Sequence, residues 1–365
     1  MPSATRARDL GLVVGELPTG RLDKISDVPG VRVGHCTVAA GDSMTGATAV
    51  MPAAGNVFSG KLRASAAVLN GYGKSTGLIQ IAELGLLESP ILLVNTLNVG
   101  LAADALVEHE IRECAREGLE LTSFNPVVCE CNDSYLSDIR ARAVGRDQVF
   151  AAIADARSDF AEGDVGAGKG MSCHGLKGGI GSASRLLRIE GRDFVLGALV
   201  LANHGRLEDL TILGRQLGKE LRSRERNLPE KGSVIIVIAT DLPLSDRQLG
   251  RACRRSAVGL ARVGSYLGHG SGDIAIGFST ADPVRRDEGR EILATRELRE
   301  DGMDAVFRAV AESVEESVLN AMIAADPVEG YKGHRRESLR DILLALGEAQ
   351  AADPARPGGP AGPAG

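Results

Sequence analysis

The sequence is poor in the features that would place it on nucleic acid or in a membrane. It contains no tryptophan, and aromatic residues make up only 3% of its 365 residues. Its formal net charge of −6 is opposite to the basic surface that neutralises nucleic-acid phosphates. No apolar run reaches the roughly 18 residues of a membrane-spanning helix, and the N-terminus lacks the apolar segment of a signal peptide. We therefore expect a cytoplasmic protein with neither a nucleic-acid nor a membrane partner.

The six cysteines also lack the spacing of a metal site or a disulfide framework. No pair has the Cys-x-x-Cys spacing through which two thiolates commonly share a tetrahedral zinc ion. In a long chain without a signal peptide, reduced thiols are expected rather than disulfides. A site built from Cys129, Cys131, Cys173 and His174 is the remaining alternative, and metal analysis would test it. We predict no metal and no cofactor.

What the chain does contain is typical of a globular protein with many tight turns. Apolar residues make up 44% of the sequence, charged residues 25%, and there are 46 glycines. Periodicity predicts helices over residues 103–119 and 302–325 and a fully buried strand over 234–240. We expect one α/β domain over residues 1–348. The proline, glycine and alanine tail over 349–365 is too poor in apolar surface to fold and is predicted to be disordered.

The most abrupt change of character along the chain falls at Gly232 and Ser233, between a charged segment and the apolar strand. One interpretation is a loop entering a strand, because Gly-Ser is a common turn pair. The other is self-cleavage, because Gly232 lacks a Cβ and permits a strained conformation in which the Ser233 hydroxyl attacks the preceding carbonyl. The cut would make Ser233 an N-terminal residue. Its α-amine, titrating near about pH 8, could then act as the base for its own hydroxyl.

Four further residues carry side chains suited to such chemistry. Ser271 and Asp273 lie two positions apart on an extended segment, so both can face one reacting group and orient its amine. Asn203 ends an apolar run, where its amide could donate to a developing oxyanion. Glu130 follows another apolar run, where its carboxylate could hold a substrate ammonium. Each also has an ordinary interpretation as a turn, a cap or a solvated acid.

Six short segments stand in an order that matches one known family over nearly the whole chain. They are Ile25–His35, Asn70–Gly77, Gly166–Ser172, Lys177–Gly181, Ala202-Asn203 and the Gly232-Ser233 junction. Together they resemble the L-aminopeptidase/D-esterase family, which includes the β-peptidyl aminopeptidases. The resemblance implies a four-layer α/β/β/α sandwich of the N-terminal-nucleophile-hydrolase type. It also implies self-cleavage into a larger chain (1–232) and a smaller chain (233–365), and a homo-oligomer of these processed pairs.

Carried over residue by residue, the resemblance makes Ser233 the nucleophile. In the same way Ser271 and Asp273 hold and tune its amine, Asn203 supports the oxyanion, and Glu130 binds the free amine of the substrate. The implied activity is an aminopeptidase, amidase or esterase. It releases N-terminal residues from small peptides, amides or esters through an acyl-enzyme.

One departure from the family pattern concerns the pocket. Asn132 stands where some members carry a tyrosine, and Tyr135 follows three residues later. The second oxyanion donor and the shape of the pocket therefore stay open. The preference for L-, D- or β-residues and the size of the oligomer stay open as well.

Other function classes remain as alternatives. An acyl transferase of similar mechanism would pass the acyl group to an amine instead of water, and an unprocessed, non-enzymatic scaffold would leave Ser233 silent. A nucleotide binder is suggested by Gly73-Lys74-Ser75. It fits poorly, because Val68 stands where a phosphate-binding loop of the Walker type needs a glycine.

Overall fold

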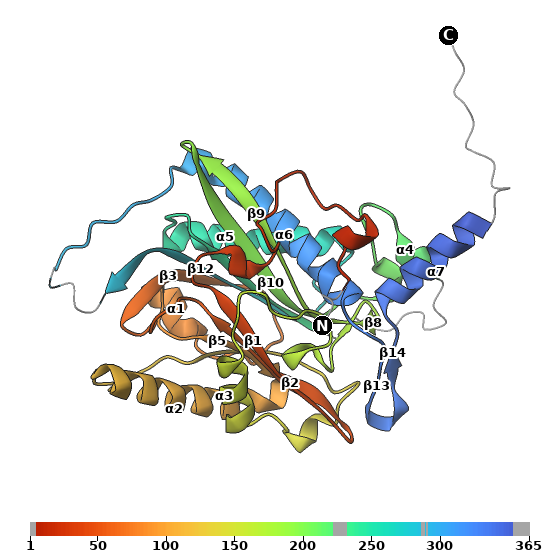
Figure 1. The fold of residues 1–365 in the computed structure, drawn as a ribbon, viewed down its shortest axis with the longest axis horizontal. Helices are drawn as coiled ribbons and strands as arrows, with labels where there is room; N and C mark the ends of the chain where they lie inside the picture. Colours follow the sequence, from red (N-terminus) through yellow and green to blue (C-terminus); the bar gives the residue numbers. More distant parts are fainter. Residues whose placement is uncertain (1–4, 222–231, 286–288, 290, 353–365) are drawn as a thin grey trace, which may run out of the picture.

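The computed structural model describes residues 5–221, 232–285, 289 and 291–352. They form two large sheets packed face to face and two short two-stranded sheets (Figure 1). The strands are β1 Arg32–Ala40, β2 Ser43–Met51, β3 Gly60–Gly71, β4 Leu86–Leu87, β5 Ile91–Asn95, β6 Val127–Cys131, β7 Ser172–Cys173, β8 Leu176–Lys177, β9 Gly179–Ile189, β10 Arg192–Asn203, β11 Ser233–Thr240, β12 Gly272–Arg285, β13 Val328–Glu329 and β14 Arg335–Arg336. The helices are α1 Leu78–Leu84, α2 Val99–Glu117, α3 Arg146–Ala154, α4 Leu217–Glu220, α5 Asp246–Arg262, α6 Met303–Ile323 and α7 Leu339–Ala352.

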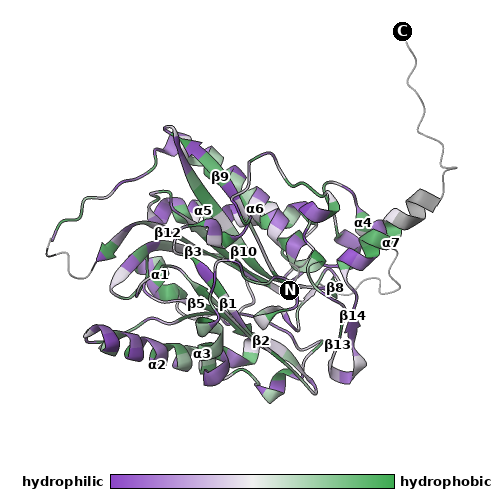
Figure 2. Ribbon diagram, viewed as in Figure 1, coloured by the Kyte–Doolittle hydropathy of each residue, from purple (hydrophilic) through white to green (hydrophobic). Residues whose placement is uncertain are grey.

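Three apolar clusters fill the spaces between the layers. One lies between α5, α6 and the larger sheet, a second lies between the two sheets, and the third lies between the smaller sheet and α2 and α3. Figure 2 shows strands dominated by hydrophobic residues, whereas α2 alternates hydrophobic and hydrophilic residues as a surface helix should. The layers therefore run helix, sheet, sheet, helix, and the predicted α/β/β/α sandwich is confirmed.

The larger sheet has the strand order β4-β3-β12-β11-β10-β9, and the smaller sheet has the order β1-β2-β5-β6. Strand β11 pairs antiparallel with β10 and parallel with β12, and every one of its residues is buried. Strand β12 in turn pairs antiparallel with β3. Strands β11 and β12, which follow Gly232 in the chain, thus lie between β10 and β3, which precede it.

A buried ion cluster joins α6 to the early part of the chain. Arg185 on β9 is fully buried and lies 3.0 Å from Glu312 and 2.6 Å from Glu316, both on α6. Arg8 also contacts Glu316, at 2.6 Å. Asp23 lies 3.5 Å from Arg185, and burial raises the pKa of its carboxyl to about 7. These ion pairs hold α6 to segments that precede Gly232 in the chain. They add to the packing of the apolar face of α6 against the larger sheet.

The predicted elements are confirmed with small shifts of their ends. The helix expected over 103–119 is α2, the one over 302–325 is α6, and the strand over 234–240 is β11. Helix α7 extends to Ala352, so the first four residues of the tail predicted to be disordered are helical, and the rest lies outside the described residues. Among the described helices, none is long and apolar enough to cross a membrane.

Candidate active site

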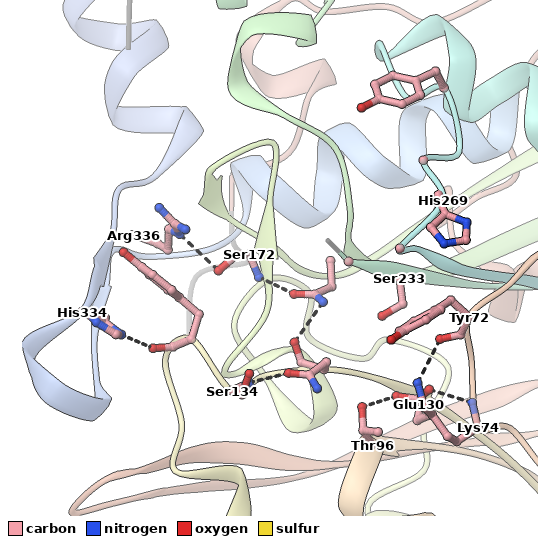
Figure 3. Close-up of a pocket in the computed structure, with 17 residues that line it drawn as sticks. Tyr72, Lys74, Thr96, Glu130, Ser134, Ser172, Ser233, His269, His334 and Arg336 are labelled. Carbon is pink, nitrogen blue, oxygen red and sulfur yellow. Dashed lines mark hydrogen bonds between the residues drawn. The ribbon is translucent and has the colours of Figure 1, made fainter. Parts of the chain in front are cut away.

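A pocket of about 1000 Å³ lies where strands of the two sheets end side by side. The larger sheet contributes Asn203 at the end of β10 and Ser233 at the start of β11, and the smaller sheet contributes Glu130 near the end of β6. Figure 3 shows Ser233 and Glu130 directed into this space from opposite sides. The structure therefore brings together three residues that lie far apart in the sequence and were predicted to share a site.

Ser233 is the first residue of β11 and is only 4% exposed. Strand register pairs it with Asn203 on one side and with Gly272 on the other. Its hydroxyl has no conventional hydrogen-bond partner among the described residues, and the Cys131 thiol is its polar neighbour. Burial holds the pKa of that thiol well above its usual value, so Cys131 stays protonated. A buried hydroxyl that faces a pocket is free to turn toward a reacting carbonyl.

Gly232 is sterically confined to glycine. A Cβ at this position would lie 2.2 Å from the Asn203 carbonyl oxygen, a contact that real side chains do not make. The Gly232 carbonyl oxygen accepts a hydrogen bond of 3.1 Å from the Gly272 main-chain N–H. Such a donor would stabilise negative charge on this oxygen if the carbonyl were attacked. The requirement for glycine comes from this close approach to Asn203.

Ser271 and Asp273 lie on either side of Gly272 and are fully buried. The Ser271 hydroxyl donates to Asp273 Oδ1 at 2.6 Å. Strand alternation places Asp273 on the helix-facing side of the larger sheet, because the next residue, Ile274, packs between the sheets. The pair therefore lies beside the main chain of Gly232 and Ser233 and is not among the residues that line the pocket.

The Asn203 side chain is anchored at both of its polar atoms. Its Oδ1 accepts from the Ser172 N–H at 2.9 Å, and its Nδ2 donates to the Asn132 carbonyl oxygen at 3.0 Å. An amide nitrogen carries two hydrogens, so one remains for a second acceptor. Since Asn203 pairs with Ser233 across the strands, that hydrogen is available beside the hydroxyl.

Glu130 is buried, at 3% exposure, and each of its oxygens has a protein donor. Oε1 accepts from the Lys74 main-chain N–H at 2.9 Å, and Oε2 accepts from the Thr96 hydroxyl. Each oxygen of an ionised carboxylate has about two acceptor positions, so room remains for a cation from the pocket. The carboxylate is therefore fixed in orientation and still able to bind an ammonium group.

Several pocket residues were not singled out from the sequence for a role in the site. Ser172 and Lys74 fall inside two of the matched segments, but nothing in their spacing indicated contacts with Asn203 and Glu130. Tyr135, His334 and Arg336 form a second wall of the pocket. His334 and Arg336 come from about 200 residues further along the chain than Tyr135, so no local pattern could have found them.

The residues that could bind a metal ion in the structure differ from the set considered from the sequence. Among the described residues, Cys173 and His174 meet His204, with ligand atoms within 4.8 Å of one another, while Cys129 and Cys131 lie in the core between the sheets. Burial lowers the pKa of both imidazoles, which keeps them neutral. His174 Nδ1 donates to the Arg206 carbonyl oxygen at 3.0 Å. The cluster adjoins Asn203, because His204 follows it in the chain and Cys173 follows Ser172, whose N–H donates to Asn203.

Comparison with known proteins places this geometry in a family. The chain is 37% identical over 349 residues to the β-peptidyl aminopeptidase BapA of Sphingosinicella xenopeptidilytica, covering 89% of this chain and 86% of the relative. A solved structure of a Pyrococcus horikoshii protein matches with a TM-score of 0.88 and 44% identity, covering 95% of this chain and 99% of that chain.

The L-aminopeptidase D-Ala-esterase/amidase of Ochrobactrum anthropi is a second structural match, with a TM-score of 0.87 and 35% identity over 95% of this chain and 99% of that chain. It is described as a prototype for the serine aminopeptidases and as a variant of the Ntn-hydrolase fold. The sequence model described as peptidase family S58 matches residues 23–336. The chain therefore belongs to peptidase family S58, and it is a serine hydrolase with an Ntn-hydrolase fold.

Proposed function

We propose that the chain cleaves its own Gly232–Ser233 bond and then uses Ser233 to release N-terminal residues from small peptides, amides or esters. The observation that carries this proposal is the pairing, in one pocket, of the Ser233 hydroxyl with the buried Glu130 carboxylate. The first group can form an acyl-enzyme, and the second can select a substrate with a free amine. N-acetylated analogues are accordingly expected to be poor substrates.

In the first reaction, the Ser233 oxygen bonds to the Gly232 carbonyl carbon and the carbon–nitrogen bond between the two residues breaks. The resulting ester is hydrolysed by water, which leaves a carboxylate on Gly232 and a free amine on Ser233. The Gly272 N–H, already bonded to the Gly232 oxygen, supports the charge that develops there. Two chains, 1–232 and 233–365, result from this single cut within one domain.

In turnover, the Ser233 hydroxyl attacks the carbonyl of the substrate's first residue while its own amine accepts the proton. The remaining Asn203 Nδ2 hydrogen stabilises the oxyanion, and Ser271 and Asp273 orient the amine. The intermediate then collapses: the bond to the leaving nitrogen or oxygen breaks, and the Ser233 amine passes its proton to that leaving group. Water hydrolyses the acyl-enzyme, which releases the first residue and restores the Ser233 hydroxyl. Asn132 lines the pocket, and its main-chain carbonyl accepts a hydrogen bond from Asn203 and so fixes the orientation of that side chain.

Denaturing mass spectrometry of the purified protein beside an S233A variant tests the proposal. We expect two chains that meet between Gly232 and Ser233 in the parent and one intact chain in the variant, with peptidase activity lost by at least about a thousandfold. A single intact chain in both samples would contradict self-cleavage and favour a non-enzymatic scaffold. The homo-oligomeric assembly and the cytoplasmic location stay predictions, which native mass spectrometry and cell fractionation test separately.

A further inference from the structure

The pocket has a second wall, opposite Glu130, that the proposed chemistry does not use. There the Tyr135 ring stacks on the His334 ring, with centroids 4.4 Å apart and planes 12° from parallel. The Arg336 guanidinium lies 3.8 Å from the centroid of the same tyrosine ring. Figure 3 shows Arg336 and His334 together on the far side of the pocket from Glu130. One end of the pocket is therefore acidic and the other basic.

The basic end is held in place by main-chain contacts. Strands β13 and β14 form a hairpin in which Arg336 pairs with Val328. The hairpin docks on the loop that carries Tyr135, because Tyr331 N–H donates to the Leu136 carbonyl at 2.8 Å and His334 Nδ1 donates to the Tyr135 carbonyl at 2.7 Å. The stack is therefore a built feature of the fold.

Arg336 uses only part of its donor capacity. Its Nε donates to the Ser172 hydroxyl at 3.2 Å, and no described carboxylate lies within ion-pair distance of its guanidinium. The neighbouring Arg335, in contrast, is exposed and lies 2.8 Å from Glu337. A guanidinium has five N–H donors in a planar fork that matches a carboxylate. Arg336 thus presents unused donors to the pocket.

A short relay of contacts connects Arg336 to the proposed reaction centre. Ser172 accepts from Arg336 through its hydroxyl and donates through its main-chain N–H to Asn203 Oδ1, at 2.9 Å. Asn203 pairs with Ser233. With an ammonium at Glu130 and a scissile carbonyl at Ser233, the leaving part of a substrate extends toward Arg336.

We propose that Arg336, positioned by Tyr135 and His334, binds the free C-terminal carboxylate of the leaving residue. The preferred substrates are then short zwitterionic peptides rather than amides or longer chains. This inference rests on the proposed function, because it takes the positions of the ammonium and of the scissile bond from it. An extended chain spans about 3.3–3.6 Å per residue, so length selects the peptides whose two charges reach both ends.

The pocket also contains Lys74, a second cation. The Lys74 main-chain N–H donates to Glu130. Its side-chain ammonium lies 4.4 Å from the Tyr72 ring centroid and donates a hydrogen bond to the Tyr72 carbonyl. Lys74 thus belongs to the acidic end, where a carboxylate on the leaving side does not reach. The experiment separates the two cations.

The test compares dipeptides with a free C-terminal carboxylate with the same dipeptides as C-terminal amides, using the processed full-length protein. We expect the parent to favour the free acid by about tenfold or more in kcat/KM, the size expected for charge-assisted hydrogen bonds. In R336Q this ratio should fall close to one, mainly through a higher KM for the acid. R336K should lie between the two, since it keeps the charge and loses the planar fork. The matched control R335Q should keep the parental ratio.

A parent without preference for the acid would overturn the proposal, and so would an R336Q variant that keeps the parental ratio. Collapse of the ratio in K74M instead of R336Q would place the carboxylate at the acidic end and equally contradict it. Mass spectrometry of R336Q for the two processed chains establishes that the variant folds. Failure of the proposed function looks different, because then the parent would cleave neither the acid nor the amide.

Discussion

The two sheets contribute different kinds of groups to the pocket. The larger sheet presents Ser233 and Asn203 from adjacent strands, and a third strand supports Gly232 through the Gly272 N–H; each of these strands is paired on both sides. The smaller sheet presents Glu130 from β6, the last strand in its order. The groups proposed to break bonds thus stand where the main chain is held most firmly. The group proposed to recognise the substrate stands on the last strand of the other sheet, where the next residue, Cys131, is the polar neighbour of the Ser233 hydroxyl.

The largest effect is expected at the junction in the larger sheet, from G232A. The added Cβ would meet the Asn203 carbonyl oxygen at 2.2 Å, so the carbonyl must move away from its Gly272 donor. We expect self-cleavage to slow by at least about a hundredfold, the effect of losing one oxyanion donor, measured as the rate at which the two chains appear. The control is G100A on α2, where an added Cβ meets nothing within 4 Å. Cleavage of G232A at the parental rate would mean that self-cleavage does not depend on the hydrogen bond between the Gly232 carbonyl and Gly272.

Next in size is D273N, which removes the charge beside the proposed amine while keeping the shape. We expect both self-cleavage and turnover to slow by about a hundredfold, because Ser271 loses the carboxylate to which it donates. D282N, in the partly exposed end of the same strand, is the matched control and should retain both rates. Full rates in D273N would remove this residue from the proposed site.

N203A separates the two reactions within the larger sheet. Turnover should fall by about a hundredfold in kcat, since the donor to the substrate oxyanion is lost. Self-cleavage should fall less, because the Gly232 oxygen keeps its bond from the Gly272 N–H. Thermal melting checks that the loss of the Ser172 and Asn132 contacts has not unfolded the site. Equal losses in both reactions would argue that one oxyanion site serves both.

The smallest effect is expected in the smaller sheet, from E130Q. We expect KM for substrates with a free amine to rise about tenfold or more, with little change in kcat and in the rate of self-cleavage. The glutamine oxygen can still accept from the Lys74 main-chain N–H, and the Thr96 hydroxyl can turn to accept from the new NH2 group, so the fold of the loop is preserved. Equal rates for free and N-acetylated substrates in the parent would contradict the assignment of substrate recognition to Glu130 and the smaller sheet.

The sequence was sufficient for the elements with strong patterns. Strand β11 follows from its uninterrupted apolar run, and α2 from its helical periodicity. The grouping of Ser233, Asn203 and Glu130 came from the motif resemblance, because spacing alone gives no contact between strands so far apart in the chain. The bond from Gly272 to Gly232 and the side of the sheet that carries Asp273 depend on strand order and register. Arg336 lies in a two-residue strand beyond any local signal, and only the folded hairpin brings it to Tyr135.

The position of β11 and β12 between β3 and β10 has a kinetic consequence. While the chain is intact, folding is unimolecular, and its rate and midpoint do not depend on protein concentration. If the bond after Gly232 is cut, unfolding separates two polypeptides, and neither can complete the larger sheet without the other. Reassembly becomes a second-order reaction that slows on dilution. The mature form would then be a molecule that folds once as a precursor and afterwards persists through slow unfolding, with refolding yields that depend on how it was made.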